Sequence, residues 1–284
     1  MPMSQDSLRT QSLPRAGKDR LAEGFDPRGG LPLAAVERIA ASIVGVDPSP
    51  AGVLLDVGVG TGEIGASVAR IPGLRYCGLD LSLSTLLRFD HRLRRVGASA
   101  WLLRADADRP WPVRNGSVRI FFLSRAAHLL RFEPLVAEAV RTAHPDGAWV
   151  ILGRVRREAS SVRATLRRAL HRLLGESGIE SVSGEAAQHL LAAALARHGG
   201  TSMPPQVVAT WTAAECPAGA LATWRDKPSL AGIPLPAPVR DEVLDRLEAW
   251  ARRRYGDLDT VREASESYEL SAVRLPPLPW APPA

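Results

Sequence analysis

The chain has 284 residues, of which 45% are hydrophobic and 23% charged, and this composition excludes a wholly disordered chain, a collagen-like repeat and a disulfide scaffold. Its length suits one large domain or two small ones. The formal net charge of +6 would by itself favour nucleic acid or an anionic lipid as a partner. Nearly all basic residues are arginines, with Lys18 and Lys227 as the only lysines, so the charge reflects a compositional bias and receives little weight.

The cysteine count and the hydropathy of the chain indicate where the protein works. Cys77 and Cys216 are too few for a cysteine-rich zinc site, and we expect no metal site. No apolar run approaches the roughly 20 residues that span a bilayer, and the N-terminal sequence lacks the apolar stretch of a secretion signal. We therefore expect a cytoplasmic protein without a membrane span.

Residues 1–30 are polar and interrupted by prolines and glycines, which predicts a flexible arm. From Leu33 onward, segments with helical spacing alternate with short apolar runs typical of buried strands. The predicted helices are 33–46, 62–71, 82–97 and 132–144, and the predicted strands are 53–57, 75–80, 100–105, 118–124 and 148–153. This alternation predicts right-handed βαβ units and a doubly wound, mostly parallel α/β sheet with helices on both faces.

After Gly153 the periodicity is mainly helical. Helices are predicted over 161–174, whose arginines are expected on a solvated face, over 184–199, and from Pro238 to a stop at Gly256. Residues 206–213 and 266–275 are predicted strands. We expect one domain over residues 31–275, with a helical cap inserted at about 155–203, and a proline-rich tail at 276–284.

The segment LLDVGVGTGEIG, residues 54–65, joins a predicted strand to a predicted helix. Its glycines let the chain turn sharply and let a ligand approach the backbone, but they also satisfy the dinucleotide pattern GxGxxG, which is weak alone. Asp56 at the strand end would repel a pyrophosphate and favours a cationic ligand such as S-adenosylmethionine. Asp80, at the end of the next strand, can accept hydrogen bonds from both ribose hydroxyls.

At these residues the sequence resembles the class I S-adenosylmethionine-dependent methyltransferases, in particular the small-molecule group similar to the ubiquinone and menaquinone biosynthesis enzymes. The resemblance spans about residues 25–275. LLDVGVGTG resembles motif I, YCGLDLS the second-strand motif, RADADRPWPVRNGSV the segment that binds adenine, and FFLSRAAHLL the region lining the transferred methyl. Asp146 and Trp111 replace a usual glycine and leucine. The resemblance implies a seven-stranded sheet of order 3-2-1-4-5-7-6 with the seventh strand antiparallel.

The resemblance also implies S-adenosylmethionine as the cofactor and S-adenosylhomocysteine as its product. Within it, Asp106 would accept a hydrogen bond from the adenine amino group, and Ala107 would supply its backbone N–H. Phe25 resembles an aromatic residue near the cofactor in the N-terminal segment of the family. The complete set expected to bind the cofactor is Asp56, Gly58, Val59, Gly60, Thr61, Gly62, Asp80, Leu81, Asp106, Ala107, Ser124 and Phe25.

His128 is the candidate catalytic residue, because it follows the fourth predicted strand at the sheet edge where ligands bind and has a pKa suited to removing a proton. It is alternatively a structural histidine. Arg125 in the same loop is a candidate for binding an acidic group of the substrate, or for pairing with a surface carboxylate. The leading hypothesis is O-, N- or C-methylation of a small molecule by in-line transfer. RNA methylation and a non-catalytic binding protein are the alternatives, and the sequence does not identify the acceptor or the oligomeric state.

Overall fold

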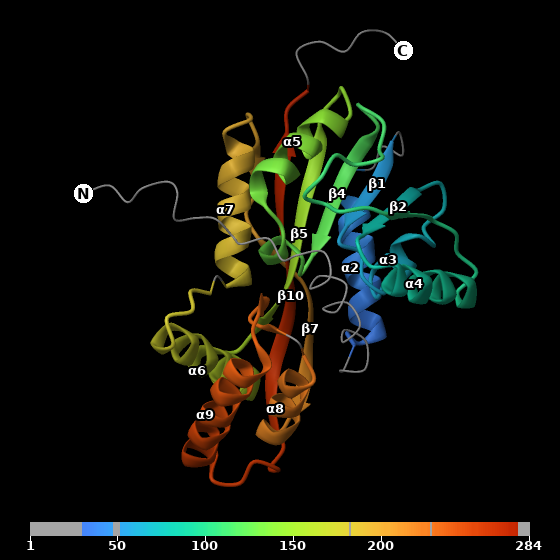
Figure 1. Ribbon diagram of the computed structural model, residues 1–284. Coiled ribbons are helices and arrows are strands. Elements are labelled where there is room, and N and C mark those ends of the chain that lie inside the picture. The colour runs from blue at the N-terminus through green and yellow to red at the C-terminus, as the bar shows by residue number, and fades with distance from the viewer. Residues whose placement is uncertain (1–29, 48–51, 182, 228, 278–284) are drawn as a thin grey trace.

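The computed structural model describes residues 30–47, 52–181, 183–227 and 229–277. In this part of the chain a central sheet carries helices on both faces (Figure 1). The strands are β1 (Val53–Val57), β2 (Arg75–Asp80), β3 (Trp101–Arg104), β4 (Val118–Ser124), β5 (Ala148–Arg157), β6 (Thr201–Ser202), β7 (Gln206–Glu215), β8 (Ser229–Leu230), β9 (Ile233–Pro234) and β10 (Arg262–Leu275). The helices are α2 (Leu33–Gly45), α3 (Gly65–Val68), α4 (Leu83–Arg95), the 3-10 helix η2 (Ala127–Leu129), α5 (Phe132–Thr142), α6 (Val162–Glu176), α7 (Gly184–Ala196), α8 (Pro217–Arg225) and α9 (Ala237–Tyr255).

The main sheet has the strand order β3-β2-β1-β4-β5-β10-β6, and β7 also pairs with β10. Strands β1 to β5 pair in parallel with one another, whereas β10 is antiparallel to β5, β6 and β7. This confirms the predicted α/β class and the predicted order, with β10 as the antiparallel strand. Both β6 and β7 occupy the edge where one strand was expected, because Pro204 and Pro205 between them have no N–H for the ladder.

The two faces of the sheet bury different helices. Because side chains alternate along a strand, Leu54 packs on the face covered by α2, α3 and α4, whereas its neighbour Leu55 packs on the face covered by α5 and α7 (Figure 1). Ser82, Ser161 and Ser183 cap the N-termini of α4, α6 and α7 by accepting a hydrogen bond from a backbone amide of the first turn. Because β1, β2 and β4 are parallel, their C-terminal ends lie at the same edge of the sheet, between the two layers of helices.

A third apolar cluster lies outside the sheet. It joins α6, α8 and α9 through buried residues that include Leu166, Leu170, Trp224 and Leu244, and it lies at the lower end of the molecule in Figure 1. The expected cap range 155–203 thus holds two helices with different neighbours. Helix α6 packs with α8 and α9, whereas α7 packs on the sheet because its small apolar face fits beside α5.

Two other elements differ from the sequence predictions. The helix predicted over 62–71 is limited to α3, because Gly62 has a φ of 71° and residues before Gly65 form a turn instead. Helix α8 and the β8–β9 hairpin were not predicted. A local signal for α8 exists, since Cys216 caps its N-terminus and Pro217 occupies its first turn.

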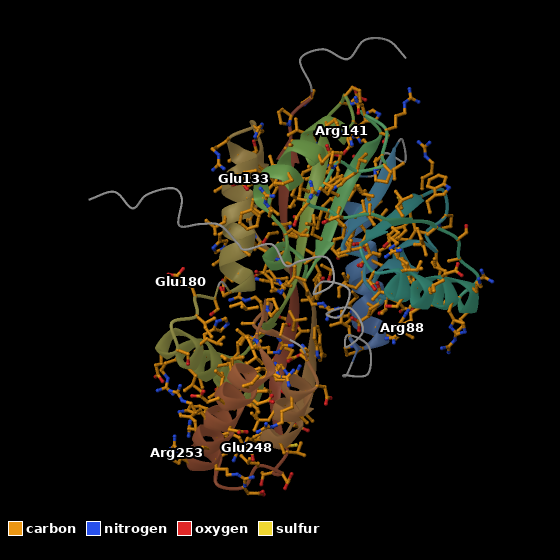
Figure 2. All side chains as sticks on the ribbon, in the orientation of Figure 1. Arg88, Glu133, Arg141, Glu180, Glu248 and Arg253 are labelled. Atoms are coloured by element: carbon orange, nitrogen blue, oxygen red, sulfur yellow. The ribbon has the colours of Figure 1, made fainter. Side chains whose placement is uncertain are left out.

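Within the described parts of the chain, each helix is too short or too polar to cross a membrane. The same residues contain no group of three or more histidine, cysteine or acidic side chains that is arranged to hold a metal ion. Several arginines pair with carboxylates, for example Arg154 with Glu185, Arg156 with Glu269, Arg157 with Glu266 and Arg225 with Glu248. Figure 2 shows the side chains on the helices and strands.

Candidate functional site

The glycine loop, residues 58–64, leaves the end of β1 and turns over the end of β2. The amides of Gly58 and Val59 donate to the Leu79 carbonyl at 2.8 and 3.1 Å, which anchors the loop to β2. Gly58 and Gly60 have φ values of 72° and 57°, in the left-handed region that favours glycine. A Cβ at Gly58 would come within 2.9 Å of Ala126, whereas one at Gly60 would meet nothing within 4 Å. The loop is therefore packed on one side and open at Gly60.

Asp80 connects the glycine loop to the start of α4. Its Oδ2 accepts a hydrogen bond from the Gly60 amide at 2.8 Å, and its Oδ1 accepts from the Ser82 amide at 2.9 Å and from the Thr85 hydroxyl at 3.3 Å. A carboxylate offers about four acceptor positions, so these contacts leave capacity for a further donor. Asp80 thus shapes the loop in addition to being available to a ligand.

Asp56 lies beneath the glycine loop and is only 3% exposed. Its Oδ2 accepts a hydrogen bond from the Tyr76 hydroxyl at 2.6 Å, while its buried Oδ1 has no hydrogen-bond partner within the described structure. Burial raises the pKa of Asp56 to about 7, the Tyr76 hydrogen bond opposes this rise, and the nearby Asp80 adds to it. A cation brought close to Oδ1 would favour the charged carboxylate.

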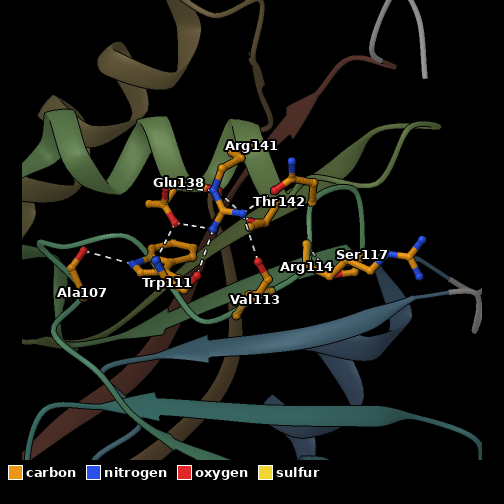
Figure 3. A network of polar contacts seen from close by, with 9 residues as sticks. Ala107, Trp111, Val113, Arg114, Ser117, Glu138, Arg141 and Thr142 are labelled. Atoms are coloured by element: carbon orange, nitrogen blue, oxygen red, sulfur yellow. Dashed lines mark hydrogen bonds and ion pairs between the residues drawn. The ribbon is translucent and has the colours of Figure 1, made fainter. Parts of the chain in front are cut away.

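The segment after β3 is fastened to α5 by a polar network around Trp111 (Figure 3). The Trp111 indole donates to the Ala107 carbonyl at 3.1 Å, and its amide donates to Glu138 at 2.6 Å. Arg141 in turn donates to Glu138 and to the carbonyl oxygens of Trp111 and Val113. The indole N–H explains why tryptophan suits the place of the usual leucine, since it holds the backbone beside Asp106.

Asp106 and Ala107 occupy the turn that this network positions. The Asp106 Oδ1 accepts a hydrogen bond from the Asp108 amide at 3.1 Å, and the Asp106 carbonyl accepts from the Arg109 amide at 3.0 Å. The preceding amide, of Ala105, donates to the Asp80 carbonyl at 3.0 Å, so the turn begins directly beside the end of β2. The structure therefore brings Asp80 and Asp106 to the same edge of the sheet.

Ser124 and Arg125, at the end of β4, have partners within the chain. The Ser124 hydroxyl shares a hydrogen bond of 2.6 Å with the buried Tyr268 hydroxyl of β10. The Arg125 guanidinium pairs with Glu63 at 2.6 Å, and the other Glu63 oxygen accepts from the Leu31 amide at 2.5 Å. Glu63 thus ties the glycine loop both to β4 and to the segment entering α2.

Arg125 also has backbone and side-chain features that a surface residue would not show. Its φ is 56°, which is uncommon outside glycine, and its buried Nε has no hydrogen-bond partner among the described residues. Such strained backbone is often found at ligand sites. The ion pair with Glu63 nevertheless occupies one side of the guanidinium that was expected to hold a substrate.

His128 lies in η2, just beyond the end of β4. A side chain at Gly232, in the β8–β9 turn, would come within 3.3 Å of the His128 Cδ2, and one at Gly184 of α7 would come within 4.0 Å of its Nδ1. Burial, with the nearby positive charges of Arg167 and Lys227, lowers the pKa of His128 to about 4. The imidazole is therefore neutral at physiological pH.

The other expected residues contribute mainly backbone. The Thr61 carbonyl accepts from Arg92 at 3.2 Å and the Leu81 carbonyl from Arg104 at 3.3 Å, while Val59 packs against Gly78. Phe25 lies outside the described residues. Sequence reasoning missed Glu63, Tyr76 and Tyr268, whose partners come from distant segments; only the position of Glu63 within the loop motif was a signal.

Residues 54–147, which run from the glycine loop strand to the turn before β5, match the family model described as a methyltransferase domain. None of the curated proteins matches the chain.

Solved structures resemble the chain over most of its length. An assumed methyltransferase from Bacillus halodurans C-125 is 14% identical, with 84% of this chain and 98% of that chain covered and a TM-score of 0.53. The YcgJ protein from Bacillus subtilis is 15% identical, with 86% and 98% covered and a TM-score of 0.52. An assumed sarcosine dimethylglycine methyltransferase from Galdieria sulphuraria is 13% identical, with 90% and 96% covered and a TM-score of 0.51. At these identities the likeness establishes the fold.

The match of residues 54–147 to a methyltransferase domain supports an enzyme that uses S-adenosylmethionine, and the solved structures support the Rossmann-like fold. The finer resemblance to ubiquinone and menaquinone enzymes is not distinguished by these comparisons and stays a prediction.

Proposed function

We propose that the protein transfers a methyl group from S-adenosylmethionine to a small molecule bound between η2, α7 and the β8–β9 turn. The observation that carries the proposal is the cradle at the carboxyl edge of the sheet, where the Gly60 amide meets Asp80 and the loop is open. The hydrogen bond from the Gly60 amide to Asp80 thus joins the glycine loop after β1 to the acidic residue at the end of β2.

The residues of the cradle fit the cofactor. Asp80 retains acceptor capacity for ribose hydroxyls, and the left-handed glycines let a ligand contact the loop backbone. The unpartnered Asp56 Oδ1 suits the ammonium or sulfonium charge, although the side chain lies beneath the loop. Asp106 and Ala107 would hold the adenine, and Gly58, Thr61, Leu81, Ser124 and Phe25 would complete the wall.

The bound cofactor would supply an electrophilic methyl group on a sulfonium, so that an acceptor nucleophile could bond to the methyl carbon in line while S-adenosylhomocysteine leaves as the neutral thioether. The chain contributes alignment and exclusion of water. His128 is neutral and adjoins the fourth strand, so it can take a proton from an O–H or N–H acceptor at one of its ring nitrogens. Its low pKa makes it a weak base, which suits an acidic acceptor proton better than an unactivated alcohol.

The acceptor is proposed to be small because the chain itself encloses His128. Gly184 begins α7 and Gly232 lies in the β8–β9 turn, and both are close enough that a side chain at either position would approach the ring. Two glycines on separate elements therefore leave limited space beside the imidazole. A folded RNA would need a more open approach.

Titration calorimetry tests the cofactor step. S-adenosylmethionine and S-adenosylhomocysteine should bind with comparable affinity, while NAD and NADP should not, because Asp56 places a carboxylate at the end of β1, where a pyrophosphate would lie. Dinucleotide binding without binding of the methionine cofactors would refute the proposal.

A screen of acceptors with radiolabelled cofactor tests transfer itself. His128→Asn, which keeps a polar side chain but cannot act as a base, should bind S-adenosylhomocysteine like the wild type and lower kcat by about 10²-fold or more. Exposed His91 on α4 provides the control His91→Asn, which should leave kcat unchanged. Binding of cofactor with no transfer to any metabolite-sized acceptor would favour the non-catalytic alternative.

A further inference from the structure

One face of α6 carries a cluster of cationic side chains. Arg163, Arg167 and His171 are spaced four residues apart, so they lie along one face of the helix. Arg157, at the end of β5, adjoins this face, since its charge acts on both Arg163 and Arg167. We call Arg157, Arg163 and Arg167 the arginine cluster. The predicted solvated face of this helix is thus partly a contact surface.

Two members of the arginine cluster have carboxylate partners. Arg157 pairs with Glu266 of β10 at 2.6 Å, across the register that joins β5 and β10. Arg163 forms a close ion pair with Glu215 at the end of β7. These two pairs connect the arginine cluster on α6 and β5 to β10 and β7. The carboxylates of Glu266 and Glu215 are thus already paired.

Arg167 is the third member, and among the described residues it forms no hydrogen bond or ion pair. Its side chain is exposed. The surrounding protein reduces the hydration of the guanidinium and lowers its pKa to about 10. The charges of Arg157 and Arg163 lower this pKa further, whereas Glu266 raises it. A guanidinium that lies beside two other cations and forms no ion pair of its own can donate hydrogen bonds to an anionic group of a ligand.

The position of Arg167 relates it to the proposed acceptor site. The positive charge of Arg167 contributes to the lowered pKa of His128, which follows β4, and of His171 on the same helix. His171 itself is held by a hydrogen bond to Ser181, at 2.5 Å. The β8–β9 turn provides the geometric link: Leu230 packs in the same apolar cluster as Leu166 of α6, and a side chain at Gly232 of this turn would approach the His128 ring within 3.3 Å.

We propose that Arg167 binds an anionic group of the acceptor molecule, a carboxylate or a phosphate, and so orients the acceptor beside His128. The planar guanidinium can donate two parallel hydrogen bonds to either oxyanion. The proposal rests on the proposed methyltransferase function and narrows its substrate class to small acids.

The binding test uses the full chain loaded with S-adenosylhomocysteine, at constant ionic strength, and compares wild type with Arg167→Gln. The probes are inorganic diphosphate and benzoate, whose binding is measured by calorimetry. Wild type should bind at least one of them about tenfold more tightly than Arg167→Gln, because the variant loses a charge-assisted pair. Stronger binding of diphosphate would identify a phosphate acceptor, and stronger binding of benzoate a carboxylate acceptor.

Arg172→Gln is the matched control, since Arg172 lies on the same helix and pairs with Glu176 on its exposed side at 3.7 Å. It makes the same change in net charge and should bind the probes like the wild type. Equal binding by wild type and Arg167→Gln, or equal loss in both variants, would overturn the proposal. Failure of all three proteins to bind S-adenosylhomocysteine would instead refute the proposed function.

A stability measurement separates ligand binding from a structural role. Because Arg167 is an unpaired cation among cations, Arg167→Gln should unfold at an equal or higher denaturant concentration than wild type, and diphosphate or benzoate should raise the midpoint of wild type only. A lower midpoint for Arg167→Gln without ligand would show that Arg167 stabilises the fold and would overturn the proposal. Among acceptors found by the screen, Arg167→Gln should raise KM for acids and leave their methyl esters unaffected, with partial rescue by Arg167→Lys.

Discussion

Asp56 is a buried carboxyl group that we propose lies close to the positive charge of the cofactor. The chain places it under the glycine loop with one oxygen bonded to Tyr76 and the other without a partner. Burial raises its pKa to about 7, so the folded protein binds a proton there that the unfolded chain releases at its ordinary value of 3.8. Between these two pH values the folded state holds more protons, and the contribution of Asp56 to stability falls as pH rises.

Proton release on cofactor binding follows from this pKa. A cation near the Asp56 carboxyl would favour its charged form, so S-adenosylhomocysteine should bind more weakly as pH falls below about 7, by up to about tenfold per pH unit. Calorimetry in two buffers with different ionisation enthalpies would measure the protons released. Asp56→Asn should remove this release, whereas Asp90→Asn on the exposed face of α4 should keep it. Equal proton release by wild type and Asp56→Asn would show that the ligand does not sense Asp56.

Asp80 is expected to serve both the loop and the ribose. Asp80→Ala removes three hydrogen bonds within the chain and the proposed bonds to ribose, which as charge-assisted bonds contribute roughly 1.5 to 3 kcal/mol to binding. S-adenosylhomocysteine affinity should fall more than the free energy of unfolding, measured by calorimetry and urea denaturation. Unchanged affinity would remove Asp80 from the cofactor site.

At the scale of elements, sequence patterns predicted segments that have a local cause. The alternation of strands and helices and the stop of α9 at Gly256 each follow from residues close in the chain. The short α3 was overpredicted, because the turn at Gly62 replaces the first part of the helix. The partners of Ser124 and Arg125 were not predictable, since Tyr268 and Glu63 reach them only through the fold.

The network between α5 and the segment after β3 shows how a helix supports the site. Glu138 has its pKa lowered chiefly by the hydrogen bond from Arg141, so it is charged at neutral pH. Glu138→Ala leaves Arg141 without its ion pair and the Trp111 amide without its acceptor. We expect a loss of about 2 to 3 kcal/mol of unfolding free energy, measured by urea denaturation.

The same variant should weaken S-adenosylhomocysteine binding, because the turn holding Asp106 loses its support. Glu133→Ala, an exposed change on the same helix, should alter neither property. If Glu138→Ala lost stability but kept full affinity, the network would support α5 alone and not the adenine site.

At the scale of the whole molecule, the sequence predicted the sheet better than the cap. The strand order depends on local strand signals and on general rules for crossovers, and it was confirmed. The outer cluster of α6, α8 and α9 is assembled from segments separated by α7 and the strands that follow it. Helical spacing shows that a helix has an apolar face but not which partner covers it, so α6 and α7 looked alike in sequence.

Because α6 and α7 belong to different apolar clusters, we expect them to respond differently when the cofactor binds. A site that excludes water and admits an acceptor needs a movable cover, and we expect the N-terminal arm and the cap to provide it. The arm lies outside the described residues, but Leu31 beside it is held by Glu63 of the glycine loop. Helix α6 belongs to the outer cluster, whereas α7 packs on the sheet and is already part of the main core.

Amide exchange with and without S-adenosylhomocysteine measures closure. We expect added protection within α6 more than within α7, because α7 packs in the core of the sheet whereas α6 belongs to the outer cluster. Exposed α9 residues far from the loop, such as Arg253, should exchange alike in both states and serve as an internal reference. Added protection confined to the glycine loop would mean that the cofactor binds without closing a cover, and the acceptor would then reach His128 through a site that is already formed.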